Sequence, residues 1–387
     1  MATLESRPFT LLQHGTQDDE SVYHKTGKAG NGHIKTSYNE ILQLIKAENL
    51  LRKVPAFYVK RLVIISAIAI SLWTALYFIA TSNNVWLYAL AVPVMILQGI
   101  MAAQYGFIAH ETAHRQVFKD NHVNDNMGRI LANLFAGLSY GFWMNKHNRH
   151  HNKPNQIDYD PDINISVISF TTESLDKKKG LEHLLSKNQG WLFPLLLCFT
   201  GFHLLLDSFI ALGRKDKDKR LTHKTAEFAM MLVRQAAPIV ILFLIFPPIW
   251  AAGLWLAMFM AFGLFMGGAF APNHKGMPLV PKDARIDFFQ RQVLTSRNIR
   301  STWLTDNLMG GLNFQVEHHL FPSMARPFLN RAHEIVTQYC KDKGVPFMET
   351  GLFESYGIII KYLNKVGLSN NADPFVCPMI ATLRPRN

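Results

Sequence analysis

Half of the 16 histidines in this 387-residue chain fall in four short stretches of sequence. The stretches read HETAH, KHNRHH, APNHKG and VEHHLFP, and their histidines are His110, His114, His147, His150, His151, His274, His318 and His319. Side chains three or four residues apart lie on one face of a helix, so a stretch can direct its imidazoles toward one point. Neutral imidazole is a good ligand for first-row metals, iron included. The spacing therefore predicts a metal site.

The number of histidines indicates more than one metal ion. A zinc site usually needs only three or four protein ligands, whereas these imidazoles suit two ions with positions left for oxygen or water. A single HxxxH stretch is more often structural than catalytic. Four stretches beside apolar segments are a stronger signal, because ionisable groups at a membrane are costly. We therefore predict a pair of metals that can change redox state.

The elements that would position these histidines are apolar runs long enough to cross a bilayer as helices. Hydrophobic residues make up 49% of the chain and are clustered. Four runs are predicted to span, at residues 62–80, 85–109, 229–246 and 249–271. The predicted fold class is an all-α integral membrane protein with four transmembrane helices in two hairpins. Interfacial helices and a cytosolic helical cap would complete it, with the histidine-rich site in the cap.

A fifth apolar segment, residues 191–212, is predicted to lie in the membrane interface. If this segment crossed, the residues after 271 would lie on the opposite side from His110. The basic loop at 213–224 would then also be exported, against the positive-inside rule. Residues 128–142 are a second candidate interfacial helix. We therefore expect both termini and all the histidine stretches on the cytoplasmic side.

The segments outside the membrane domain, which is predicted to cover residues 56–322, are polar. Residues 1–55 are predicted to form a cytosolic leader without a cleaved signal, and residues 323–387 a cytosolic C-terminal segment. An amphipathic helix is expected in each, at 39–51 and 327–343. The net charge of +12 lies between apolar runs, which is typical of loops beside anionic lipids rather than of nucleic-acid binding. Three scattered cysteines indicate neither a disulfide framework nor a thiolate metal site.

Acidic residues near the histidines could hold the imidazoles in place, because a metal-bound imidazole usually donates its second N–H to a carboxylate or carbonyl. The candidates are Glu111, Glu317 and Asp158, with Asp160 and Asp162 beside the last. Ordinary solvated acids are the alternative for each of them. The remaining histidines are assigned to packing or to the surface: His14, His24, His33, His122, His183, His203, His223 and His333.

In this order, the histidine boxes resemble those of the membrane fatty acid desaturase family, which shares its scaffold with some lipid hydroxylases. The resemblance covers about residues 104–322. It implies a non-haem di-iron centre, molecular oxygen as co-substrate and two electrons. The implied ligands are His110, His114, His147, His150, His151, His318 and His319, with His274 as the extra histidine after the last span. Asn273 departs from the pattern, because the asparagine associated with that histidine lies four residues earlier in known relatives.

Gln315 is the main departure from the family pattern, since most of the superfamily has histidine at this position of the third box. The sequence QVEHH resembles front-end desaturases and actinobacterial acyl-CoA desaturases. Many front-end enzymes carry a fused cytochrome b5 domain with an HPGG motif, and this sequence contains no HPGG. The resemblance therefore implies an external electron donor, a ferredoxin or a flavin oxidoreductase. It also favours a bacterial inner membrane as the location.

The reaction implied is insertion of a cis double bond into an acyl chain carried by coenzyme A or by a phospholipid. A lipid hydroxylase or ketolase on the same di-iron scaffold is the nearest alternative, and the QVEHH box favours desaturation over it. A zinc-dependent membrane hydrolase would need fewer histidines. A non-catalytic membrane scaffold would not need them at all.

Overall fold

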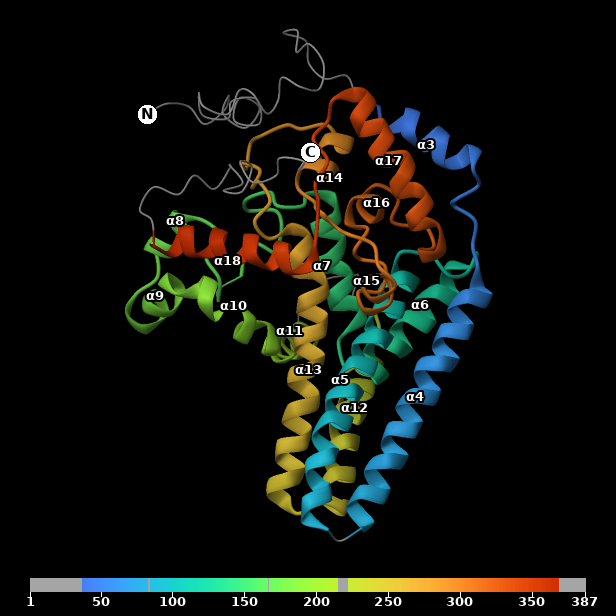
Figure 1. The fold of residues 1–387 in the computed structure, drawn as a ribbon, viewed down its shortest axis with the longest axis vertical. Coiled ribbons are helices and arrows are strands. Elements are labelled where there is room, and N and C mark those ends of the chain that lie inside the picture. Colours follow the sequence, from blue (N-terminus) through green and yellow to red (C-terminus); the bar gives the residue numbers. More distant parts are fainter. Residues whose placement is uncertain (1–36, 83, 166, 215–221, 369–387) are drawn as a thin grey trace.

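Four long apolar helices make up the membrane part of the molecule, which confirms the predicted fold class and the four predicted spans (Figure 1). They are α4 (Pro55–Thr81), α5 (Val85–Ala113), α12 (Lys224–Ile245) and α13 (Pro248–His274). The computed structural model describes residues 37–82, 84–165, 167–214 and 222–368, so most of the predicted leader lies outside the described residues. Both α5 and α13 continue past the predicted spans into their histidine stretches.

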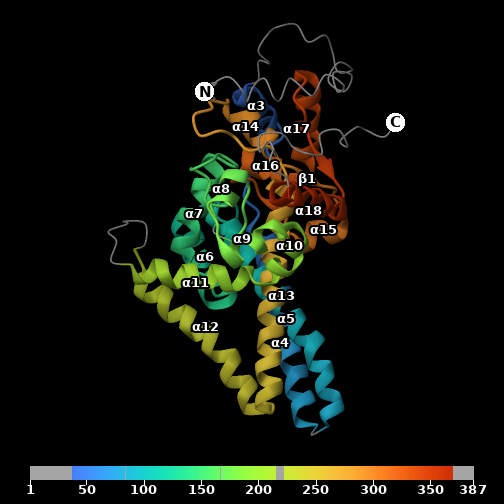
Figure 2. The ribbon, with the colours of Figure 1, turned by 90° about the vertical axis from the view of Figure 1, so that its left-hand side faces the viewer.

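The four helices form two hairpins that turn at the same end of the molecule (Figures 1 and 2). Asn84 begins α5, because its side chain accepts a hydrogen bond from the Trp86 amide at 3.0 Å. The second hairpin turns at Pro247, after which α13 begins. The helices α5 and α13 pack closely, and a Cβ on Gly99 would lie 2.3 Å from the Met258 carbonyl oxygen. Only glycine therefore fits at this crossing.

The predicted interfacial segment 191–212 is two helices rather than one. They are α10 (Gln189–Cys198) and α11 (Thr200–Gly213), and their axes differ by 67°. The break lies against α13, where a Cβ on Gly263 would come within 2.5 Å of the Cys198 carbonyl oxygen. Both helices lie against α13 in Figure 1, and α10 also packs against the C-terminal helix α18 (Leu352–Leu368). Their place in the membrane interface stays a prediction.

Residues 128–142 do not form the single helix that was predicted. They cover the end of α6 (Asn121–Ile130), the π-helix η1 (Leu131–Ala136) and the start of α7 (Tyr140–Asn152). Gly137 ends η1 with a φ of +84°, and a Cβ there would lie 2.6 Å from Nε2 of Gln235. Ser139 then begins α7 by accepting a hydrogen bond from the Phe142 amide. This close contact with α12, which hydropathy cannot reveal, explains the break.

The remaining elements form a cap above the spans (Figure 1). In chain order they are α3 (Tyr38–Ala47), α8 (Thr172–Asp176), α9 (Gly180–Lys187), α14 (Phe288–Leu294), β1 (Asn298–Ile299), α15 (Trp303–Leu308), α16 (Gln315–Leu320), η2 (Arg326–Phe328), α17 (Leu329–Lys343) and β2 (Glu349–Thr350). β1 and β2 pair in parallel. The predicted amphipathic helices at 39–51 and 327–343 correspond to α3 and to η2 with α17. The apolar faces of α3 and α17 pack together in one core, around Ile41, Ile45 and Val336.

Candidate metal centre

Eight histidines from α5, α7, α13 and α16 meet at the junction of the spans and the cap, and they fall into two groups. The five-histidine group consists of His110, His114, His147, His151 and His318. The three-histidine group consists of His150, His274 and His319. Within each group, one ring nitrogen of every histidine lies within 4.8 Å of the others. The groups adjoin, since the rings of His151 and His319 stack with centroids 4.1 Å apart.

Helix geometry explains how neighbours in sequence reach different groups. His147 and His151 are four residues apart on α7 and share a face, whereas His150 between them turns toward α13. Adjacent residues on a helix point in directions about 100° apart, so His318 and His319 on α16 also serve different groups. The Nε2 atoms of His110 and His147 lie 3.0 Å apart, although the two residues belong to different helices.

The imidazoles are buried, and several of their nitrogens have no partner. Among the described residues, none donates to or accepts from either ring nitrogen of His151, or Nε2 of His318 and His319. Buried polar atoms are normally hydrogen-bonded, so unpartnered nitrogens gathered in these two groups fit metal-binding positions. Burial and the neighbouring imidazoles hold the pKa of His147, His151, His318 and His319 well below the ordinary value. These rings are therefore neutral at physiological pH, which is the form that binds metal.

Burial also acts on His114, which lies just beyond the end of α5. Burial, followed by the charge of Arg115, lowers the pKa of His114 to about 3. Its Nε2 lies 2.8 Å from Nε2 of His147. Two protonated rings could not remain this close, whereas two neutral rings can donate lone pairs to one shared cation.

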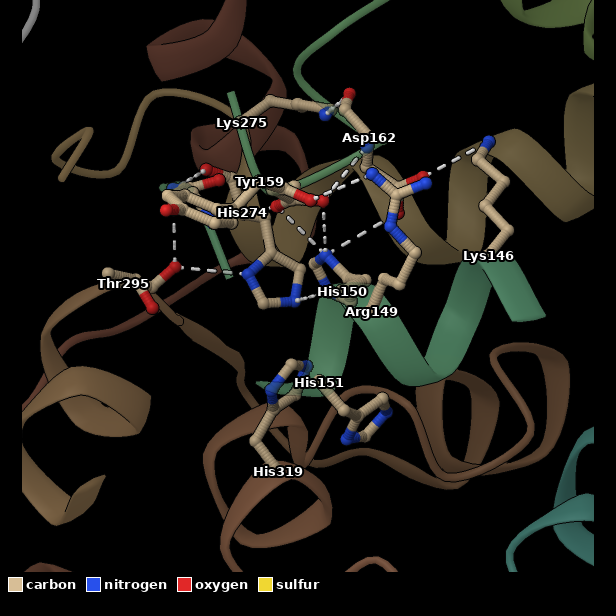
Figure 3. A network of polar contacts seen from close by, with 12 residues as sticks. Lys146, Arg149, His150, His151, Tyr159, Asp162, His274, Lys275, Thr295 and His319 are labelled. Atoms are coloured by element: carbon tan, nitrogen blue, oxygen red, sulfur yellow. Dashed lines mark hydrogen bonds and ion pairs between the residues drawn. The ribbon is translucent and has the colours of Figure 1, made fainter. Parts of the chain in front are cut away.

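Acceptors behind the three-histidine group fix which nitrogen faces the centre (Figure 3). Nδ1 of His150 lies 3.0 Å from both carboxylate oxygens of Asp160. Nδ1 of His274 lies 3.0 Å from the Thr295 carbonyl oxygen, and Nδ1 of His319 lies 2.9 Å from Oε1 of Gln292. Each Nδ1–H can donate to its oxygen, which leaves Nε2 free for a metal ion.

Asp162 lies 3.6 Å from Nδ1 of His150, but Asp160 is the acid that is hydrogen-bonded to this ring. Asp160 is fully buried and accepts hydrogen bonds from the backbone amides of Asn155, at 2.7 Å, and Asp162, at 2.8 Å. Burial alone would lower the pKa of His150, but the carboxylates of Asp160 and Asp162 outweigh it and raise that pKa. His150 therefore differs from His147, His151, His318 and His319, whose pKa values are lowered.

Gln315 lies inside the centre, at the position where most of the resembling family has a further histidine. Its Nε2 lies 2.9 Å from Nε2 of His274. Asn273 donates from Nδ2 to Oε1 of Gln315 at 3.0 Å, and the Oδ1 atom of Asn273 is buried without a partner among the described residues. Asn273 therefore orients the Gln315 amide at the edge of the three-histidine group.

The other predicted acids have different places. Asp158, expected near the histidines, points to the surface instead, with its side chain 57% exposed and 3.1 Å from Lys282. Its positive φ of 68° turns the chain so that Asp160, two residues later, reaches His150. Glu111 forms a buried ion pair with Arg326 and touches none of the ligating imidazoles through a hydrogen bond.

Glu317 also faces away from the metal groups. It accepts a hydrogen bond from Asn298 at 2.7 Å and pairs with His333 at 3.1 Å. His333, assigned to packing from the sequence, is therefore part of a charged network that also includes Glu349 at 3.3 Å. Burial opposes protonation of His333, but hydrogen bonds to the two glutamates raise its pKa to about 10.

Sequence reasoning missed the residues that orient the imidazoles from outside the boxes. Gln292 and Thr295 lie on and just after α14, in a segment without a recognisable motif. The sequence offers Asp158, Asp160 and Asp162 after the second box with nothing to separate them, and in the structure Asp160 is the one hydrogen-bonded to His150. Trp143 was also missed, although its spacing of four residues before His147 places it on the same face of α7; the two rings stack at 4.4 Å.

Comparison with known proteins agrees with this centre. The model of the fatty acid desaturase family matches residues 85–351. The Delta(6)-fatty-acid desaturase fat-3 of Caenorhabditis elegans is 30% identical over 275 residues, which cover 68% of this chain and 62% of that protein. The Delta(5) fatty acid desaturase fat-4 of the same organism is 25% identical over 354 residues, covering 86% and 74%.

A moss protein is similar over a comparable length. The acyl-lipid (9-3)-desaturase of Physcomitrium patens is 26% identical over 344 residues, which cover 85% of this chain and 62% of that protein. This chain thus spans between about 62% and 74% of the length of these three relatives. All three come from eukaryotes, and the bacterial membrane favoured by the sequence stays a prediction.

Proposed function

The chain belongs to the fatty acid desaturase family, and on that premise we propose that it inserts a double bond into a fatty acyl chain. The observation that carries the proposal is the convergence of eight buried imidazoles, from four separate helices, into two adjoining groups. Two groups fit two metal ions, and the family resemblance implies that these would be iron. The relatives' names all specify desaturation, so we do not favour a hydroxylase.

The residues present fit a metal pair. The five-histidine group would hold one ion, and the three-histidine group, with Gln315 beside it, would hold the other. Breaking an unactivated C–H bond is beyond any side-chain acid or base, and bound iron with molecular oxygen would supply that oxidation. The two electrons would come from an external donor, a ferredoxin or a flavin oxidoreductase.

The protein's own groups would orient the ligands and exclude water. Asp160, Gln292 and Thr295 hold three imidazoles with Nε2 directed inward. Trp143 and Phe270 provide apolar surface beside the five-histidine group, with Phe270 centred 5.8 Å from the His110 ring. We propose that the reacting methylenes of the acyl chain lie against this surface, because an apolar wall both binds a hydrocarbon and keeps water away.

The membrane setting supports a lipid substrate and suggests an orientation. The helices α5 and α13 reach the cap at their histidine-bearing ends, so a chain dissolved in the bilayer and a headgroup in water could reach one site (Figure 1). The loops on the cap side are basic, and we infer from the positive-inside rule that this side faces the cytosol. Gln315 and the Delta(6) and Delta(5) relatives together favour a front-end position for the new double bond.

The proposal is tested by expression in a host that lacks polyunsaturated fatty acids, with a reductase supplied. We expect a new acyl species two mass units lighter than its precursor, and mapping of its double bond tests the front-end assignment. His318→Ala should abolish the product, whereas His203→Gln, a partly exposed histidine paired with Asp207 on α11, should not. A product 16 mass units heavier, or no new lipid from protein that binds iron and receives electrons, would refute desaturation.

A further inference from the structure

A cavity separate from the metal centre lies among the membrane helices. It has a volume of about 240 Å³ and is bounded by α4, α5, η1, α12 and α13. Its wall is mostly apolar and includes Trp73, Phe135, Ile241 and Met258. None of the eight ligating histidines lines it. Two long polar side chains, Gln98 and Arg234, do line it, and they make it unlike an ordinary packing defect.

Arg234 lies in a membrane span without a counter-charge. It is ten residues into α12, which places it about 15 Å along the helix from Lys224. No described carboxylate forms an ion pair with it, and Glu227 on the same helix is already engaged by Ser139 and the Gly141 amide. A charged group inside a membrane is costly and normally pairs with another group or serves a ligand.

The described part of the protein offers hydrogen-bond acceptors to only some of the Arg234 guanidinium N–H groups. Its Nε donates to the Phe135 carbonyl oxygen at 2.7 Å, which holds the side chain under the end of η1. Its Nη1 is buried and has no hydrogen-bond partner in the described part of the chain. A planar guanidinium recognises a carboxylate or phosphate through paired N–H donors. The missing partner of Arg234 is therefore an anion.

The size and opening of the cavity indicate which anion. Its volume is below the roughly 300–1,000 Å³ of common small-molecule sites, so it suits a small headgroup and part of one hydrocarbon chain, the rest of which would extend into the bilayer, rather than a two-chain phospholipid. Val233 lines the cavity and is 56% exposed on the lipid-facing surface of α12. A lipid molecule can therefore enter from the bilayer without passing through the cap.

We propose that this cavity binds a free long-chain fatty acid, with its carboxylate on Arg234 and its hydrocarbon chain against the apolar wall. Each component of the ligand has a matching feature: one positive charge for the carboxylate, apolar side chains for the chain, and a lateral opening for entry. The site is distinct from the place where the acyl substrate would meet the metals. The proposal therefore holds whether or not the chain is a desaturase, and its test needs no activity measurement.

Trp73 on the cavity wall gives a direct readout, because bromine atoms quench tryptophan fluorescence on contact. The full chain is placed in phosphatidylcholine nanodiscs and titrated with 9,10-dibromostearate. Seven tryptophans contribute to the signal, so the Trp73→Phe variant is used to isolate the contribution of Trp73. We expect saturable quenching that is absent in Trp73→Phe and that requires at least tenfold more ligand in Arg234→Gln.

Two further variants and two further ligands distinguish binding at this site from other causes of quenching. Ala237→Leu fills the cavity and keeps the charge, so it should also weaken binding even if Arg234→Gln folds poorly. Lys60→Gln removes an exposed cation at the start of α4 and should leave binding unchanged. The methyl ester of dibromostearate should not give saturable quenching. Equal quenching by the ester, wild-type binding by Arg234→Gln, or quenching by brominated phosphatidylglycerol that free fatty acid does not displace would overturn the proposal.

Discussion

Replacement of Asp160 by asparagine tests whether the centre depends on residues behind its ligands. The Asp160 carboxylate is surrounded by donors: the Nδ1–H of His150 at 3.0 Å and the backbone amides of Asn155 at 2.7 Å and Asp162 at 2.8 Å. Asparagine has the same shape but only one acceptor oxygen, so its NH2 group must face one of these donors. His150 would then lose its fixed orientation, or the loop would shift.

The expected effect falls on metal affinity more than on folding. Loss of an outer partner of a metal-bound histidine typically costs 10–100-fold in affinity, which corresponds to about 1.4–2.7 kcal/mol. Iron retention by purified Asp160→Asn is measured against a graded series of chelator concentrations. We expect iron loss at a chelator concentration lower by that factor, with the thermal unfolding midpoint of the metal-free protein close to that of the wild type.

Asp158→Asn is the matched control, because it makes the same chemical change two residues away on an exposed side chain that pairs only with Lys282. It should retain iron as the wild type does. If Asp160→Asn also retains iron as the wild type does, the carboxylate does not orient His150. If both variants lose iron equally, the effect belongs to the loop and not to the contact.

Three other changes have defined outcomes. Glu111→Gln leaves Arg326 buried without its carboxylate, which should lower the free energy of unfolding by about 3–5 kcal/mol in denaturant titrations; an unchanged midpoint would contradict this. The pKa of His333 is raised in the folded state from 6.5 to about 10, so its contribution to stability is complete below pH 6.5 and is lost as the pH rises through 10. His333→Gln should therefore lower the thermal midpoint at pH 7 but not near pH 10.5, and an equal loss at both would point to packing. Gly99→Val would put a side chain against the Met258 carbonyl and separate α5 from α13, so both the thermal midpoint and iron content should fall, whereas a protein that keeps both would show that the helices can move apart.

The spans and the gathering of the histidines could be predicted because each depends on local sequence. Long apolar runs are sufficient for a membrane helix, and the i, i+3, i+4 spacing is sufficient to place imidazoles on one face. How the histidines divide into two groups was not predictable, because it depends on where the packed fold places α7 relative to α5, α13 and α16. His150 belongs to a different group from His147 and His151 only because α13 brings His274 to it.

The differences between prediction and structure, at residues 128–142 and at Asp158, also depend on how the chain packs. Residues 128–142 have the hydropathy of one helix, but the chain breaks where Gly137 meets Gln235 of α12. Asp158 and Asp160 are equivalent by sequence, and only the positive φ at Asp158 decides which of them reaches His150. In both places the local structure depends on contacts between segments that are far apart in the chain. Such contacts cannot be inferred from a single sequence.

The short helix α16 supplies neighbouring residues, His318 and His319, to the two histidine groups proposed to hold metal. Whatever fixes the backbone of α16 for one ion also fixes it for the other, so the entropy lost in ordering this helix is shared between two binding events. We therefore expect the ions to load cooperatively, with few molecules holding a single ion at partial occupancy. A titration that fills the two positions independently would show that α16 is already rigid before any metal arrives.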